Sequence, residues 1–381
     1  MRMFAGWKRK RSCCLEIRWS LPRIISNSST SDHASSNETS RHRHAMAAGR
    51  LKGLIMASMG DTRPALRFVS PTASRELALI AAIIIVSVIF ASASPYFLTV
   101  NNLVQTMRAG LELAIISAGM TLVIIMGAID VSVGGILAVS AIVIGKAYQA
   151  GLPVYIVTPA GLMVGTALGA FNGFITAKLK VPPIISTLGS MYIFSAIMFL
   201  VIGGAWISGL PGTLSPLING WVGFVPAAAL VIGAVYLLAW VVLRKLSFGS
   251  HIYAIGCDEH SARLVGINVD RTKIMTYALL GFLTGLAALL YVARLRNVEI
   301  NIGTTIALEA IAATILGGTN IRGGVGSLLG TLLGVAFIRI MQNGLVLMGV
   351  SSLWETVIIG SLLIVVLTGD ALRNRNNARA I

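Results

Sequence analysis

Five polar residues lie inside long apolar stretches of the sequence, where a side chain able to do chemistry stands out. They are Asp130, Asn172, Glu309, Asn320 and Glu355, with Ser132 close to Asp130. A charged or strongly polar group in lipid is costly, so each is expected to face a cavity, a helix end or a polar partner. Asp130 with Ser132 either caps a helix that begins near Val131 or lies beside a route through the membrane. Both interpretations remain open on the sequence alone.

The longest polar stretch between apolar segments spans residues 244–273. Within it Asp258 is a good helix cap, Glu259 suits the positive end of a helix, and Gly266 is a good stop. These residues predict a short helix that leaves Leu264 exposed. An exposed, capped helix is suited to docking into another protein, and the alternative is an ordinary solvated connector.

Sequence patterns for catalysis are absent from the chain. No Gly-x-x-x-x-Gly-Lys-Ser/Thr phosphate loop occurs, because Gly145-Lys146 lacks the hydroxyl residue that would follow. Cys13, Cys14 and Cys257 have no metal-ligand spacing, and no His-x-x-x-His pair occurs. We therefore expect no enzymatic activity, no metal ion and no cofactor.

The composition is that of a membrane protein. Apolar residues make up 56% of the chain and charged residues 12%, against roughly 45–50% and about 25% in soluble domains. The formal net charge of +16 comes mainly from the N-terminal part and from short loops. It does not form a basic stripe with interleaved aromatic residues, so it does not indicate nucleic-acid binding.

Residues 1–74 differ in composition from the rest. They are rich in Ser, Arg and His and lack apolar periodicity, which predicts a disordered basic extension. A second interpretation is a gene start placed too far upstream, with the true start at Met46, Met56 or Met59. The transmembrane domain is expected over 75–381.

From residue 75 onward the sequence predicts an all-α protein that crosses the membrane many times. A hydrocarbon core of ~30 Å takes about 20 helical residues. Glycine and polar residues within 95–135 and 300–325 predict that some helices there are broken or re-entrant. The ten predicted spans are 77–94, 111–129, 131–149, 154–176, 183–203, 224–243, 274–293, 304–320, 326–347 and 351–369.

Basic residues predict the orientation of these spans. With the first span leaving the cytoplasm, most Lys and Arg residues between spans lie on the cytoplasmic side, as the positive-inside rule requires. This places both termini and the 244–273 loop in the cytoplasm. Arg339 remains within a span, where it snorkels, pairs with an acid, or marks a misplaced boundary.

Glycines recur at every fourth position on three predicted helices. Separately, one short sequence pattern occurs twice in the chain, which we call the echo. The recurring positions are Gly161, Gly165, Gly169 and Gly173; Gly281 and Gly285; and Gly326, Gly330 and Gly334. We interpret these stripes as sites of close helix packing, and the alternative is a sliding seam between moving helices. The echo relates the Gly127-Ala-Ile-Asp130 segment to Gly317-Gly-Thr-Asn320, 190 residues later, and suggests duplicated structure.

Several longer motifs, in order, give the chain a resemblance to a known family. They are Gly119–Gly134, Val181–Gly189, Ala310–Thr319 and the 255–268 part of the polar loop. From about Leu77 to Asp370 the chain resembles the membrane permease subunits of bacterial ABC importers for monosaccharides, the ribose, xylose and rhamnose group. The segment Gly203–Pro211 is similar to autoinducer-2 import permeases.

The resemblance implies a multi-pass permease of the bacterial inner (cytoplasmic) membrane that works as a dimer, homomeric or with a paralogue. Its partners would be cytosolic ABC ATPase subunits, which hydrolyse the ATP, and a periplasmic sugar-binding protein. The substrate would be a pentose, a deoxyhexose or an autoinducer-2-like cyclic polyol. The resemblance assigns contact with the ATPase to the polar loop, at Ser250, His251, Ile255, Gly256, Asp258, Glu259, Ala262, Arg263, Gly266 and Ile267.

Two other classes of function can be compared with the sequence. Asp130 and Glu309 are compatible with an ion-coupled secondary transporter of small polar solutes, because buried carboxylates can carry coupling ions. A structural or channel protein would be expected to show a ring of pore-lining charges, which the sequence lacks. The sequence does not name the sugar, because specificity in this arrangement would lie mainly in the binding protein.

Overall fold

The computed structural model describes residues 71–299 and 302–351, with single positions at 354, 357, 358, 360, 361, 364 and 368. The predicted disordered extension therefore lies outside the described residues up to position 70. The first described helix, α3, begins at Pro71. A proline is well suited to the first helical position, since the amide hydrogen it lacks has no partner there.

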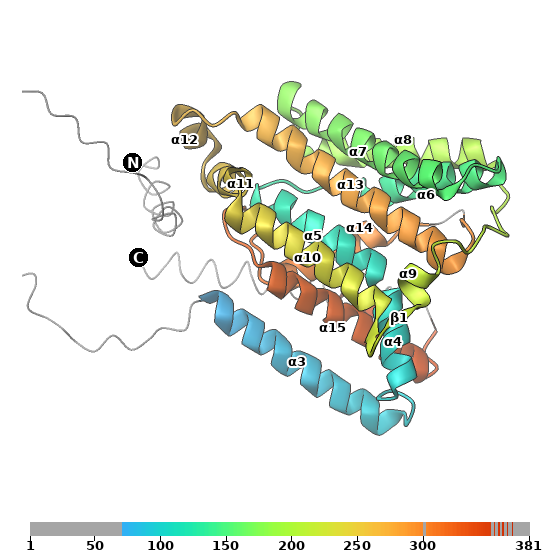
Figure 1. Cartoon of the computed structure of the whole chain (residues 1–381). Helices are drawn as coiled ribbons and strands as arrows, with labels where there is room; N and C mark the ends of the chain where they lie inside the picture. The colour runs from blue at the N-terminus through green and yellow to red at the C-terminus, as the bar shows by residue number, and fades with distance from the viewer. Residues whose placement is uncertain are drawn as a thin grey trace, which may run out of the picture. The chain divides into compact units, whose positions relative to one another are not determined.

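The described residues are almost entirely helical (Figure 1). Among them, six helices are long and apolar enough to cross a membrane. They are α3 (Pro71–Ala93), α7 (Val154–Lys178), α8 (Pro183–Ile202), α10 (Ala227–Lys245), α13 (Val269–Leu295) and α15 (Leu328–Leu347). The predicted all-α membrane fold is confirmed.

Four further helices are short or broken, in the regions where the sequence predicted it. α4 (Val100–Ala109) and α5 (Leu111–Ile125) together form a seventh candidate span, bent by 47° at the break. α6 (Val133–Gln149) and α14 (Ile306–Leu316) reach only about 25 and 16 Å at 1.5 Å per residue. Nine of the ten predicted spans thus correspond to helices, and the tenth, 351–369, lies largely outside the described residues.

The remaining elements mark the two ends of the bundle. Before the start of α10 come α9 (Pro216–Asn219) and a hairpin in which β1 (Trp221–Val222) pairs antiparallel with β2 (Val225–Pro226). After the end of α10 come α11 (Ser247–Cys257) and α12 (Glu259–Leu264). Because α10 separates these two groups, we call them the hairpin end and the loop end (Figure 1).

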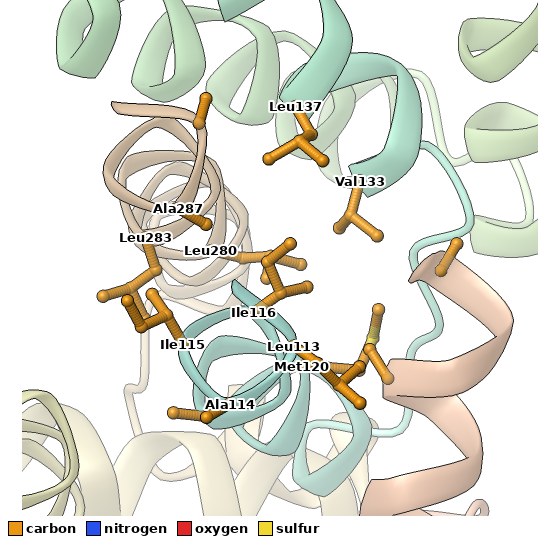
Figure 2. Close-up of a cluster of buried hydrophobic side chains, with 14 of the residues drawn as sticks. Leu113, Ala114, Ile115, Ile116, Met120, Val133, Leu137, Leu280, Leu283 and Ala287 are labelled. Atoms are coloured by element: carbon orange, nitrogen blue, oxygen red, sulfur yellow. The ribbon is translucent and has the colours of Figure 1, made fainter. Parts of the chain in front are cut away.

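The hydrophobic core is centred on α5, in which all residues are buried. It packs against α13, α14, α10 and α15. Figure 2 shows Ile115 and Ile116 of α5 beside Leu283 and Leu280 of α13. A helix that is apolar on all sides is expected at the centre of such a bundle.

Two glycine stripes bring α7 and α13 into backbone contact. A Cβ atom added to Gly165 would overlap the carbonyl oxygen of Gly281, and one added to Gly281 would overlap the carbonyl of Gly165. The same antiparallel register puts Gly169 against Tyr277 and Gly161 against Gly285. In lipid, such close approach maximises the van der Waals contact that holds helices together, so the stripes are packing surfaces, as the sequence predicted.

Candidate functional site

At the loop end, α12 has the capped form that the sequence predicted. The Asp258 carboxylate accepts a hydrogen bond of 3.1 Å from the His260 amide, which satisfies one of the unpaired donors at the helix start. The chain leaves the helix through Gly266, whose φ of +83° is readily adopted only by glycine. Leu264 and Val265 at the tip are 75% and 76% exposed.

Ion pairs hold α12 against the starts and ends of the long helices. Arg263 donates to Glu259 at 3.1 Å and to Asp270 of α13 at 2.6 Å. Lys273 of α13 donates to Glu259 at 2.8 Å, and Lys178 at the end of α7 lies 3.5 Å from Asp270. The charge of Arg263 is therefore satisfied within the chain, and the charged face of α12 is turned toward α13.

This network depends on pH through Glu259. Partial burial raises the pKa of Glu259, but hydrogen bonds from Lys273 and Arg263 outweigh that effect and hold the pKa below its usual value. A carboxyl with a lowered pKa stabilises the fold above its unfolded pKa. That contribution is lost as the pH falls through the lowered value.

We expect Arg263→Glu to loosen the hold of α13 on α12, because it removes two ion pairs and places like charges beside Glu259 and Asp270. Exposed ion pairs typically contribute about 0.2–1 kcal/mol each, and Arg263 forms two, so amide hydrogen exchange of residues 258–264 should accelerate by up to about 30-fold while the helical bundle stays folded. The charge swap Arg263→Glu with Asp270→Arg should restore part of the protection.

The matched control for this exchange measurement is Arg271→Glu. Arg271 lies at the same end of α13, is exposed, and forms no ion pair with the described residues. Two results would show that the network does not hold α12. One is faster exchange of α12 in the Arg271→Glu protein, and the other is an unchanged exchange rate of α12 in the Arg263→Glu protein.

The residues assigned to ATPase contact differ in their exposure. Ser250, Glu259, Arg263 and Gly266 are exposed, and His251, Asp258 and Ile267 are half-buried. Ile255 and Ala262 are buried, so their side chains support the fold and are not on the surface.

Gly256, like Ile255 and Ala262, faces the inside of the protein. An added Cβ there would overlap the Ile125 carbonyl at the end of α5 and approach the Gly324 amide. The Gly324 amide in turn donates to the Ile125 carbonyl at 2.8 Å. The α11 segment is thus packed directly onto the end of α5 and the loop between α14 and α15, which physically connects the loop end to the centre of the bundle.

A second group of polar residues is buried inside the bundle. Asp130 Oδ1 accepts hydrogen bonds from the Ser132 amide at 2.8 Å and from the Ser132 hydroxyl at 2.6 Å. Asn172 of α7 donates to the Ser132 hydroxyl at 2.6 Å and accepts from Ser190 of α8 at 2.5 Å. All four residues are buried. The network fixes the segment before α6 to two neighbouring helices.

The cap predicted for Asp130 and Ser132 differs from the observed one. α6 begins at Val133, two residues after the predicted start, and Ser132 makes no capping hydrogen bond with its side chain. Its hydroxyl is engaged by Asp130 and Asn172. Asp130 instead closes a tight turn onto the amide of Ser132, which is the residue directly before the helix.

Of the other intramembrane candidates, Glu355 lies outside the described residues, and Glu309 and Asn320 lie away from this network. Glu309 of α14 forms a buried ion pair of 3.1 Å with Arg339 of α15, and Arg339 also donates to Gln342. Of the three possibilities left open for Arg339, pairing with an acid is therefore the one observed. Asn320 lies in the loop after α14, where its side chain accepts from the Arg322 amide at 3.0 Å.

One buried ion pair was not predicted. Glu112 at the start of α5 pairs with Arg294 at the end of α13 at 2.8 Å, and the Glu112 side chain is only 4% exposed. The two residues are 182 positions apart. Glu112 is the second residue of α5, close to the predicted start of that span at 111, but no local signal marked it as the partner of a residue so distant in the chain.

The starts of the two short helices meet inside the bundle. A Cβ added to Gly134, in the first turn of α6, would overlap the carbonyl of Gly303, just before α14. Helix N-termini carry partial positive charge. Broken helices whose N-termini lie inside the membrane are a recurring feature of transporters.

Comparison with known proteins agrees with this architecture. Residues 102–367 match the family model described as "Branched-chain amino acid transport system / permease component". The chain belongs to this family of permease components. No solved structure matches the chain.

Several curated relatives of this permease are similar over most of their length. The ribose import permease protein RbsC of Escherichia coli (strain K12) is 36% identical over 288 residues, which cover 74% of this chain and 89% of the relative. RbsC of Bacillus subtilis (strain 168) is 36% identical over 77% of this chain and 91% of its own. The autoinducer 2 import system permease protein LsrC of Escherichia coli (strain K12 / DH10B) is 33% identical over 78% and 87%.

Both groups of candidate residues lie inside the range that matches the permease family. The buried group contains members that sequence reasoning missed, namely Ser190 together with Thr187, Thr176 and Tyr277. Their hydroxyl groups are unremarkable within apolar helices. Ser190 is distinguished by its hydrogen bond to Asn172, Thr187 by its contact with the Ile129 carbonyl, and Thr176 and Tyr277 by their burial.

Proposed function

We propose that this chain is the membrane permease subunit of an ATP-binding-cassette importer for a small sugar. The single observation that carries the proposal is α12 at the loop end. It is a capped helix held to α13 by ion pairs, with Leu264 and Val265 exposed at its tip. This is a small rigid surface suited to a protein partner.

The relatives support a sugar as the substrate. Their names specify ribose and autoinducer 2, both small polyols, whereas the family model takes its description from branched-chain amino acids. Identity of 33–36% over 74–80% of the chain is more informative about substrate class than a model that covers the whole family. We therefore favour a pentose, a deoxyhexose or a cyclic polyol of the autoinducer-2 type.

The proposed energy source is a separate ATPase subunit. The sequence has no phosphate loop. ATP would therefore be hydrolysed by the partner subunit, and α12 would couple that hydrolysis to this chain. The orientation follows from charge, because Lys178, Lys180, Arg244 and Lys245 all lie at the loop end. By the positive-inside rule this end faces the cytoplasm, and the hairpin end would meet a periplasmic sugar-binding protein.

The experiment that tests this function is uptake into proteoliposomes. The purified chain alone should move no labelled ribose or autoinducer 2. Uptake should appear only when the ATPase, ATP on its side of the membrane and the binding protein are all supplied. Uptake driven by a proton or sodium gradient without ATP would instead establish the ion-coupled secondary transporter, the second candidate, which the buried carboxyl of Asp130 favours.

A further inference from the structure

The connection between α8 and α10, residues 203–226, contains no Asp, Glu, Lys, Arg or His, and neither does the wider stretch 181–243. The connection after α10, residues 246–268, is of nearly the same length and carries Asp258, Glu259 and Arg263. Charged side chains are what keep a surface that faces water soluble. The difference between the two connections indicates that they have different surroundings.

The last part of the uncharged connection presents a cluster of apolar side chains. Within residues 217–225 the side chains of Leu217, Trp221, Val222, Phe224 and Val225 are all exposed, and Phe224 is 99% exposed. Phe224 lies at the tip of the β1–β2 hairpin, directly after Gly223, whose φ of +62° opens the turn. Exposed apolar clusters of this kind mark contact with a protein or with a membrane.

The hairpin is fixed to the bundle at its base. Ile218 of α9 is fully buried, and the Ala227 amide, at the start of α10, donates to the Gly220 carbonyl at 2.9 Å. The Arg108 side chain of α4 donates to the Asn219 carbonyl at 2.8 Å. The segment is therefore anchored on one side, and its apolar tip is left pointing away from the core.

The place of the hairpin in the chain selects the membrane as its contact. β2 ends at Pro226, and the membrane-spanning helix α10 begins at Ala227 (Figure 1). The hairpin thus lies where a span leaves the lipid, and tryptophan is enriched at that level. We propose that the β1–β2 hairpin rests in the lipid interface at this end of the bundle, with Trp221 and Phe224 between the headgroups and the first acyl carbons.

A soluble partner protein is the competing occupant, and the charges disfavour it. Transient protein interfaces have a polar rim. The charged side chains that the structure places against this connection are Arg108 and Arg296, and both donate to backbone carbonyls, those of Asn219 and Leu210. The apolar tip therefore has no charged rim of its own.

The backbone sets the depth of the hairpin. A sheet of two strands, each two residues long, has open edges with unpaired amide and carbonyl groups. Open edges do not occur in the hydrocarbon region, because water is absent there. The hairpin therefore stays at headgroup level, where water reaches its backbone while the aromatic side chains reach the lipid.

The accessibility of a spin label tests this placement in the full chain. The chain is reconstituted in nanodiscs of phosphatidylcholine, with Cys13, Cys14 and Cys257 each replaced by serine and a nitroxide attached at Phe224→Cys. Oxygen concentrates in lipid, whereas a nickel chelate stays in water. The ratio of oxygen to nickel collisions at position 224 should be severalfold higher than at a position in water.

Gln149→Cys supplies that position in water. Gln149 is polar and exposed, at the end of α6 and close to Lys146. It lies at the same end of the bundle as the hairpin, because the neighbouring Tyr148 hydroxyl is 3.3 Å from the hydroxyl of Thr213 in the same uncharged connection. Its label should collide mainly with the nickel chelate.

Two results would overturn the proposal. Equal collision ratios at 224 and 149 would place the hairpin in water, where a soluble partner could bind it. Low collision rates with both reagents at 224 would place it in a contact with a second copy of the chain. Neither readout involves ATP or transport, so both decide the matter even if the proposed function is wrong.

Lipid charge and a second variant test how the hairpin is held. Because residues 203–226 carry no charge, the ratio at 224 should not change when anionic lipid is added or when the salt concentration is raised. A label at Val225→Cys should show the same lipid contact and should lose it when Phe224→Asp is added, because a carboxylate favours water. Lipid contact that requires anionic lipid, or that persists in Phe224→Asp, would contradict the proposal.

Discussion

Replacing Gly165 by leucine should leave almost no folded permease in the membrane. A single added carbon at this position already overlaps the backbone of Gly281, so a leucine would force α7 and α13 apart. Overpacking a core typically costs about 1–3 kcal/mol and occasionally more. Here the neighbour is rigid backbone and the contact runs along the whole seam, so we expect the upper end of that range or beyond. The measurement is the yield of monodisperse protein after detergent extraction.

Alanine at the same position tests whether one added methyl group raises or lowers the stability of the protein. In a helix interior, glycine is about 1 kcal/mol less favourable than alanine, so an alanine with room for its methyl group should stabilise. Gly233 of α10 provides this control, because an added Cβ there meets nothing within 4 Å. We expect Gly233→Ala to raise the unfolding temperature and Gly165→Ala to lower it. A rise in both would mean that the α7–α13 seam is loose and would favour the sliding interpretation.

The double change Leu264→Glu with Val265→Glu should abolish binding of the ATPase while the fold is retained. Both side chains are highly exposed, so little folding energy depends on them. Residues at the centre of an interface commonly contribute 2 kcal/mol or more, which corresponds to a loss of about 30-fold or more in affinity. Co-purification of the ATPase with wild-type and variant permease measures the effect, with sugar uptake at matched membrane levels beside it.

Leu179→Glu is the comparison for this experiment. Leu179 is 62% exposed and lies at the end of α7, on the same side of the bundle, between Lys178 and Lys180. It should bind ATPase normally. If Leu179→Glu loses the ATPase and the double variant keeps it, the coupling surface lies around α7, and α12 is only a connector.

The membrane helices were predictable because their signal is local. Twenty or so apolar residues in a row specify a span whatever the rest of the chain does, and Gly and polar residues marked where α5, α6 and α14 are interrupted. α11 was missed because its own sequence does not favour a helix. It contains Gly249 and Gly256, which are poor helix formers, and both are required by close contact with Leu243 and Ile125.

The buried polar network was predictable only in part, because only some of its residues carry a local signal. An aspartate in an apolar run is conspicuous, and so Asp130 and Glu309 were found. Hydroxyl residues are not conspicuous, because in a helix they can donate to a carbonyl of the preceding turn, as Thr187 does to Pro183 at 2.9 Å. Which of them also faces Asp130 depends on how α7, α8 and α13 pack, and no single segment encodes that.

The burial of α5 sets a requirement on the order of synthesis. Its neighbours α10, α13, α14 and α15 all follow it in the chain, and α13 begins at Val269, more than 140 residues after Ile125. At about 5–20 residues per second, the ribosome needs on the order of ten seconds to supply that partner. During this interval α5 must stay in the bilayer without its final neighbours, so its all-round apolar surface is needed for insertion as well as for the finished core. Glu112, whose partner Arg294 is made later still, lies at the end of the helix, where the headgroup region can solvate a carboxylate until the pair forms.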